Sequence, residues 1–380
     1  MKNILRSAAL FFLLLAASAE GASFDAVPNW MGSSWGILTS TLTDVLELKD
    51  KEPQLPDSSY FGPDKHSNAK KINKLLDEAL EILLQGDAIV LRRQAVELRD
   101  KIPLQKLEIS ALRNKRIAAP ENSKLPWVKT RKKIDEEISG LERNIAENET
   151  ALRELNDKVA SALRSMGLDL NENQIDVLMT SVVGEDLFEN TVIFENVKRV
   201  VEKLAELSRE DADNLEITRR YYGMYVVLND LLIYSQEALE EKIEKDYKPQ
   251  LLAIQKEAEA LRKDAQDRSR QGQYSEAQRK SFQVNAASNA MTVRVAGLYI
   301  ELLEAQRKRI RSSLSDLNRN RDVADNTYNT VRSTGALRNL IREGLELFDS
   351  IQALSMPEIQ PFESDTIQKE FEEINKRLRK

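Results

Sequence analysis

The chain has 380 residues, of which 31% are charged and 41% hydrophobic, and its formal net charge at pH 7 is −6. It contains no cysteine and one histidine, which excludes disulfides and removes most nucleophile–base pairs and nearly all zinc sites. The acidic balance argues against nucleic acid or anionic lipid as the main partner, although it leaves room for a local basic patch. Only 13 glycines and 10 prolines interrupt a sequence rich in good helix formers, so we predict an all-α protein with elongated parts.

Residues 1–19 have the three parts of a secretory signal peptide. Lys2 and Arg6 precede a short apolar region, and an Ala-Ser-Ala triplet ends at Ala19. The apolar region is too short for a stable membrane span, which disfavours the alternative of an uncleaved anchor. We expect cleavage after Ala19, and an exported chain of this size without cysteine favours a location in the bacterial periplasm.

Residues 20–67 hold four of the ten prolines and predict an irregular N-terminal arm. The arm carries one amphipathic segment, residues 30–48, whose apolar face would either dock on the body or lie on a membrane surface. Docking is the better interpretation because the segment lacks the Lys/Arg face of an interfacial helix. A linking helix over residues 68–86 follows, and Gly86 ends it.

Residues 87–166 carry two heptad patterns joined by a turn that contains proline. Apolar residues recur at alternating spacings of four and three, first over residues 91–112 and then over residues 134–166. The pattern predicts an elongated antiparallel coiled-coil hairpin, in which Asn148 lies in the seam and helps to fix the register. The other faces of the hairpin are charged and leave little to pack against the body, so we expect the hairpin to project.

The turn of this hairpin places Pro126, Trp127 and Val128 at its tip. Trp127 would either pack on the turn as a hydrophobic staple or contact a partner. We take these three residues as the candidate partner-binding site.

We predict a bundle of long helices over residues 167–357 and a short C-terminal helix over residues 358–380. The most apolar stretch of the bundle, residues 221–234, is fourteen residues long, whereas a membrane span needs roughly twenty. Asn229 and Asp230 lie in its middle, so we predict a buried helix and no stable membrane span after signal cleavage. The expected core face of this helix comprises Tyr221, Met224, Val227, Leu228 and Leu231.

No catalytic, cofactor-binding or metal-binding constellation emerges from the sequence. His66 lies in a linker rich in proline, glycine and serine, where a solvated side chain is expected. Glutamate pairs such as Glu136–Glu137 and Glu240–Glu241 lie in heavily charged helices and indicate solvated faces. We therefore expect a protein that is not an enzyme and has no cofactor.

A long helical hairpin without catalytic groups favours a non-enzymatic exported scaffold or adaptor that links partners in the bacterial cell envelope. An envelope protein is the expected partner, self-association is a further option, and no nucleic acid is expected. The alternative function is a membrane-active secreted helical protein, such as a toxin component, that inserts residues 221–234 or 24–46. The two functions differ in whether these segments become exposed to lipid.

Overall fold

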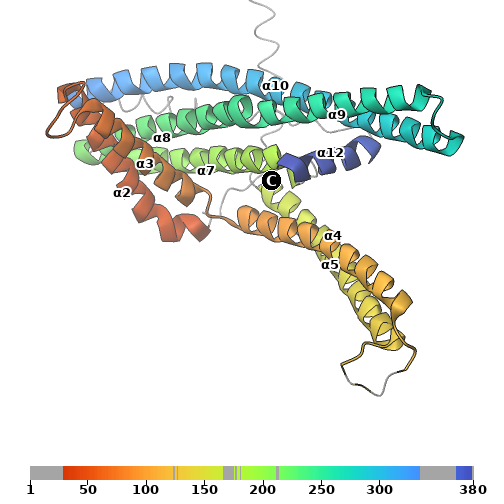
Figure 1. Cartoon of the computed structure of the whole chain (residues 1–380). Helices are drawn as coiled ribbons and strands as arrows, with labels where there is room; N and C mark the ends of the chain where they lie inside the picture. The colour runs from red at the N-terminus through yellow and green to blue at the C-terminus, as the bar shows by residue number, and fades with distance from the viewer. Residues whose placement is uncertain are drawn as a thin grey trace, which may run out of the picture.

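The computed structural model describes residues 29–122, 125, 127–165, 175, 178, 179, 181–210, 214–333 and 365–378. Within these residues every regular element is a helix, so the prediction of an all-α protein is confirmed. In chain order the helices are α2 (Asn29–Lys51), η1 (Glu52–Gln54), α3 (Lys65–Leu83), α4 (Asp87–Ala118), α5 (Arg131–Ser165), α7 (Val182–Glu210), α8 (Leu215–Lys242), η2 (Ile243–Tyr247), α9 (Lys248–Arg270), α10 (Glu276–Ser333) and α12 (Asp365–Leu378). Figure 1 shows an elongated body, from which α4 and α5 project together.

One long helical path and its return form the frame of the body. α8, the π-helical turn η2 and α9 follow one another, and α10 runs back beside them (Figure 1). Pro249 accounts for the π-turn because it has no amide hydrogen to donate, and the Lys248 N–H bonds to the Ile243 carbonyl, five residues back. The sequence predicts a bend near Pro249, and the π-helical turn η2 ends two residues before this proline.

The N-terminal segment is more regular than the sequence suggests. Residues 29–51 form α2, so the expectation of an irregular arm over residues 20–67 is wrong for this part, whereas residues 55–64 do lack regular structure. Glycine and β-branched residues lower the helix propensity of α2, but burial of one apolar face outweighs this cost. The segment docks on the body through Met31, Leu38, Leu42, Val45 and Leu46.

Two large hydrophobic clusters hold the body together. The first gathers α2, α3, the later part of α7, the first part of α8 and the later part of α10. The second gathers the base of α4 and α5, the start of α7, the region around η2, and parts of α9, α10 and α12. Tyr221 is only half-buried, whereas the other four residues predicted for the core face of α8 are at most 1% exposed. They are Met224, Val227, Leu228 and Leu231.

Side chains of α2 and α10 pack closely against α8 at Gly223. A Cβ atom at this position would overlap Leu46 Cδ2 and would lie 3.1 Å from Tyr328 Cε2. Glycine lowers the stability of an isolated helix, so its use here reflects the space that the neighbouring side chains need.

The other predicted segments compare with the helices as follows. α3 begins three residues before the predicted linking helix over residues 68–86, and α12 lies within the predicted C-terminal segment. The predicted signal peptide, residues 1–19, lies outside the described residues.

Candidate interaction sites at the hairpin tip and the α2–α3 loop

The hairpin of α4 and α5 carries the three residues that the sequence singles out. The two helices pack against each other, and their distal part has a hydrophobic cluster distinct from those of the body. Leu152 contacts both this cluster and the second cluster of the body. The distal cluster is entirely aliphatic and includes the predicted seam residues Ile102, Ile109, Leu112, Ile134, Ile138 and Ile145.

A polar pair interrupts the seam. The Asn148 side-chain amide donates to Gln105 Oε1 at 2.9 Å, and Gln105 is 8% exposed. A shift of register between the helices would bury these amides without their partners, which costs more than the hydrogen bond contributes. The sequence predicts a register-fixing role for Asn148, and Gln105 is the partner that this role requires.

Ion pairs flank the seam on its solvent side. Lys106 pairs with Glu149 and Arg113 pairs with Glu142, each at 3.0 Å. All four side chains are at least 44% exposed, so solvent and salt screen these contacts. The aliphatic seam, and not its charged border, therefore holds the two helices together.

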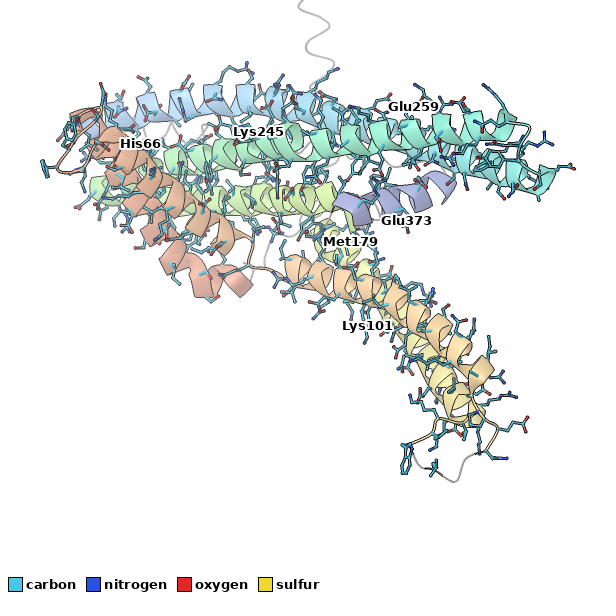
Figure 2. The ribbon with its side chains drawn as sticks, viewed as in Figure 1. His66, Lys101, Met179, Lys245, Glu259 and Glu373 are labelled. Atoms are coloured by element: carbon cyan, nitrogen blue, oxygen red, sulfur yellow. The ribbon has the colours of Figure 1, made fainter. Side chains whose placement is uncertain are left out.

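Two arginines anchor the base of the hairpin to the body. Arg92 is 5% exposed, donates to the Leu178 carbonyl at 3.4 Å and lies over the ring of Phe188. Arg99 donates to the Met179 carbonyl. The base is thus held more firmly than the heptad pattern alone indicates, and the distal half projects from a fixed base (Figure 2).

Two hydrogen bonds join the ends of the two hairpin helices next to the tip. Arg131 forms both, since its backbone N–H donates to the Pro120 carbonyl at 3.0 Å and its Nε donates to the Ala119 carbonyl at 2.9 Å. These two bonds tie the start of α5 to the end of α4.

Trp127 is 76% exposed, which argues against the hydrophobic staple. Val128 is half-buried, and its N–H donates to the Leu125 carbonyl at 3.1 Å. Pro126 lies outside the described residues.

The tip is basic although the chain is acidic. Residues 113–133 include eight Lys or Arg residues and one acidic residue. Part of this charge is neutralised within the hairpin, where Arg116 pairs with Asp135 at 2.5 Å and Lys129 pairs with Glu137 at 2.8 Å. The remaining positive charge makes the tip a local basic patch. The acidic composition of the whole chain does not exclude such a patch.

A second exposed aromatic site lies in the loop between α2 and α3, at the end of the body remote from the hairpin (Figure 1). Tyr60 and Phe61 are 100% and 97% exposed. Gly62 follows with a φ of 110°, a conformation that favours glycine, and it turns the chain towards α3. Two adjacent aromatic rings therefore extend fully into solvent.

Hydrogen bonds to Asp64 hold this loop in place. Its Oδ1 accepts from the Ser67 N–H at 2.7 Å and its Oδ2 accepts from the Ser59 N–H at 3.2 Å. The Ser67 hydroxyl completes a capping box at the start of α3. These bonds, first that from the Ser67 backbone, lower the pKa of the Asp64 carboxyl. The aromatic pair is thus presented from a fixed turn.

Tyr60 and Phe61 do not stand out in the sequence when residues 20–67 are interpreted as one irregular arm. A local signal was present. The pair is followed by Gly62 and Pro63, which favour a tight turn, and then by Asp64, a preferred helix N-cap. An aromatic pair in such a turn is held away from the hydrophobic face of either neighbouring helix.

The residues considered for catalysis lie far apart in the chain, and most of the glutamates among them form ion pairs. His66 is exposed in the first turn of α3 (Figure 2). Glu240 accepts from Arg311 and Glu241 pairs with Lys245, each at 2.5 Å. Over the part of the chain that the structure describes, no group of His, Asp and Glu side chains is arranged to hold a metal ion.

Several buried carboxyl groups of the body have a raised pKa. Burial is the largest cause for Glu189, Glu195 and Asp230. Basic neighbours oppose the shift, as Lys198 does at 3.2 Å from Glu195. Glu195 pairs with Lys198 and Asp230 pairs with Lys49, so the shifts of these two groups accompany structural ion pairs.

No family model, curated protein or solved structure matches the chain. None of the described helices has both the length and the apolar character needed to cross a membrane. The exposed aromatic residues at the two ends of the molecule are thus the features from which a function can be inferred.

Proposed function

We propose that the protein is a non-enzymatic scaffold or adaptor that is exported to the periplasm and links partners in the bacterial cell envelope. The observation that carries the proposal is the exposure of aromatic side chains at two remote ends of an elongated molecule (Figure 1). Tyr60 and Phe61 mark one end and Trp127 marks the other. Aromatic residues are enriched at protein interfaces because they bury much area with little loss of conformational entropy.

In this proposal the hairpin is a coiled-coil arm that carries Pro126, Trp127 and Val128 to a partner. α4 has 32 residues, which corresponds to roughly 48 Å at 1.5 Å per residue. Arg92 and Arg99 fix the arm at its base, so the tip is held at a distance from the body. A rigid arm with its exposed aromatic residue at the end suits contact with something that the body does not touch.

The α2–α3 loop would bind the second partner, an envelope protein. Residues 1–19 would be removed during export, so the mature chain would begin at Glu20. N-terminal sequencing of protein recovered from the envelope tests this part of the proposal. A mature chain that begins at Met1 would contradict cleavage after Ala19.

Site-specific photo-crosslinking in intact cells tests the linking function. A photoreactive amino acid is placed at Tyr60, at Trp127 or at the exposed Ser139 of the hairpin shaft, which serves as the control. We expect products of different composition from the two ends and none from Ser139. Equal products from all three positions, or none from either end, would reject the proposal.

The membrane-active alternative is less well supported. Leu42, Val227 and Leu228 are 0% exposed, so insertion of either apolar segment would require the first hydrophobic cluster to open. Amide hydrogen exchange of α8 with and without vesicles distinguishes the two functions. Loss of protection over residues 221–234 in the presence of vesicles would favour the alternative.

A further inference from the structure

Three apolar side chains near the hairpin tip are exposed. Ile117 is 78% exposed, Trp127 is 76% exposed and Leu125 is 49% exposed. They lie at the end of α4 and in the turn that follows, and the turn is closed by Arg131. An apolar group at the end of a projecting arm meets a partner before any other part of the arm does.

Exposed lysines lie close in sequence to these apolar side chains. Lys115, Lys132 and Lys133 are exposed, and none of them forms an ion pair with another described residue. The acidic side chains nearest in sequence are already engaged in part, since Glu121 lies 3.6 Å from Arg131 and other carboxylates pair as described above. Glu136 follows Lys132 by four residues and lines the same hollow, so the tip carries a partial excess of positive charge close in sequence to its apolar side chains.

The acidic body does not cancel this charge at the tip. The distal part of α4, from Ile102 to Ala118, extends roughly 25 Å beyond the base of the hairpin at 1.5 Å per residue. This length is about three Debye lengths at physiological ionic strength, where the Debye length is about 8 Å. Repulsion between the body and an anionic surface is thus largely screened when the tip touches that surface.

The combination of side chains favours a lipid surface over other anions. Tryptophan is enriched at the level of lipid headgroups, and aliphatic side chains can enter the acyl boundary. Nucleic acid would gain from stacking on Trp127 but would gain nothing comparable from Ile117 and Leu125, which have no aromatic face. A fluid surface also requires no shape complementarity from a narrow tip.

We propose that the hairpin tip is a peripheral binding site for membranes that contain anionic phospholipid. Trp127, Leu125 and Ile117 enter the headgroup region, and Lys115, Lys132 and Lys133 lie near the phosphates. Either contribution alone gives weak and reversible binding, whereas the two together give stable attachment. This inference rests on the proposed linking function and names the surface that one end of the scaffold binds.

Vesicle flotation of the full-length chain tests the site. The probe is phosphatidylcholine vesicles with or without about one third phosphatidylglycerol at physiological salt. We expect flotation only with the anionic vesicles, and we expect it to be lost at about 0.5 M NaCl, where the Debye length is much shorter. All variants share the same N-terminus, so any contribution of residues 1–19 cancels in the comparison.

Two tip variants separate the contributions. Lys132→Glu/Lys133→Glu is expected to lower partitioning by more than about 25-fold, since each basic residue near an anionic surface contributes roughly fivefold. Trp127→Ser is expected to lower it roughly tenfold through lost apolar burial. The matched control is Lys70→Glu/Lys71→Glu, at an exposed adjacent lysine pair on α3, which should float like the wild type. All three changes are at exposed positions, and an unchanged melting temperature verifies the fold.

Tryptophan fluorescence gives an independent readout. Anionic vesicles should shift the emission to shorter wavelength, and Trp127→Phe should remove the shift although Trp30 and Trp35 remain. Equal flotation of the tip variants and the wild type would overturn the inference. Tighter binding of the tip to a single-stranded oligonucleotide than to vesicles at the same salt would overturn it as well.

These outcomes are distinguishable from failure of the linking function. Absence of flotation together with specific crosslinks from Trp127 would reject the lipid site and leave the scaffold intact. Tip-dependent flotation without any crosslink from Tyr60 would support the lipid site and reject the link to a second partner.

Discussion

The body and the distal hairpin are both helical, yet different contacts hold them. The body buries large aromatic side chains to less than 2% exposure, among them Phe188, Tyr222 and Tyr299. The distal hairpin has one narrow aliphatic cluster between two helices, and its members keep 2–8% exposure. A residue of the body has neighbours from several helices, whereas a seam residue has neighbours only from the facing helix.

The two regions should therefore differ in how well they tolerate destabilising substitutions. A destabilising substitution in the seam is compensated by few neighbouring side chains. Its effect should stay within the distal hairpin, because the distal cluster meets the second cluster of the body only at Leu152. A projecting arm can therefore lose its order while the body keeps its fold. The changes below test that separation.

The largest effect is expected from Ile145→Asp. Ile145 is 8% exposed in the distal cluster, where an unpaired carboxylate should cost about 3–5 kcal/mol. We expect limited proteolysis to cut the variant within residues 102–148, while α8 and α10 stay resistant. Simultaneous cleavage of both regions would show that the hairpin and the body share one cooperative core.

Leu228→Ala probes the body in the same way. Leu228 is 0% exposed within the first cluster, and its truncation should lower the free energy of unfolding by about 2–5 kcal/mol. The melting temperature of the body should fall, and proteolysis of the hairpin should not precede that of the body. Leu107→Ala, at a hairpin residue that is 66% exposed, is the matched control and should change stability by less than about 0.5 kcal/mol.

Periodicity predicted much of this architecture. The 4-3 spacing over residues 91–112 and 134–166 depends only on local sequence, and the distal cluster follows it, whereas Arg92 and Leu163 are buried outside the pattern near the base. The irregular arm was wrong because helix propensity in α2 is low, and burial against α3 and α8 decides its state. Such tertiary burial cannot be seen in a local pattern.

The candidate sites were predictable to a smaller extent. Trp127 stood out because it lies in a turn between two heptad segments, but its exposure depends on which way the turn directs it. Tyr60 and Phe61 depend on a cap at Asp64 and on a loop geometry that spacing does not encode. Arg92 and Arg99 contact carbonyls about 80 residues away in sequence, and no periodic pattern indicates such a contact.

Gln105→Leu tests the polar pair within the seam. The change leaves the amide of Asn148 without its partner in a half-buried site, so the hairpin should lose about 1–3 kcal/mol. Gln105→Leu/Asn148→Leu should recover that loss, because two apolar side chains need no hydrogen bond. A single variant as stable as the wild type would show that the pair does not specify the register.

The buried carboxyls of the body predict a smaller, pH-dependent effect. Burial raises the pKa of Glu195 in the folded state, so the folded chain binds a proton more readily than the unfolded chain. This contribution to stability therefore increases as the pH falls from 7 towards the ordinary carboxyl range. In urea unfolding, the free energy of unfolding of the wild type relative to Glu195→Gln should be higher at pH 5 than at pH 7. An identical dependence would mean that Glu195 is solvated.

The smallest effect is expected from Arg113→Ala, which removes a charged contact across the hairpin. Arg113 is 65% exposed and lies 3.0 Å from Glu142, so the loss should stay below about 0.5 kcal/mol. The reason is that water already solvates both groups, while holding two long side chains together costs conformational entropy. The difference between Arg113→Ala and the wild type should shrink further in about 0.5 M NaCl, which screens the pair. If Arg113→Ala lost as much stability as Gln105→Leu, the ion pairs beside the seam would contribute as much as the seam to holding the two helices together. The contrast between a narrow apolar seam and a wide apolar body would then not account for how the two regions are held.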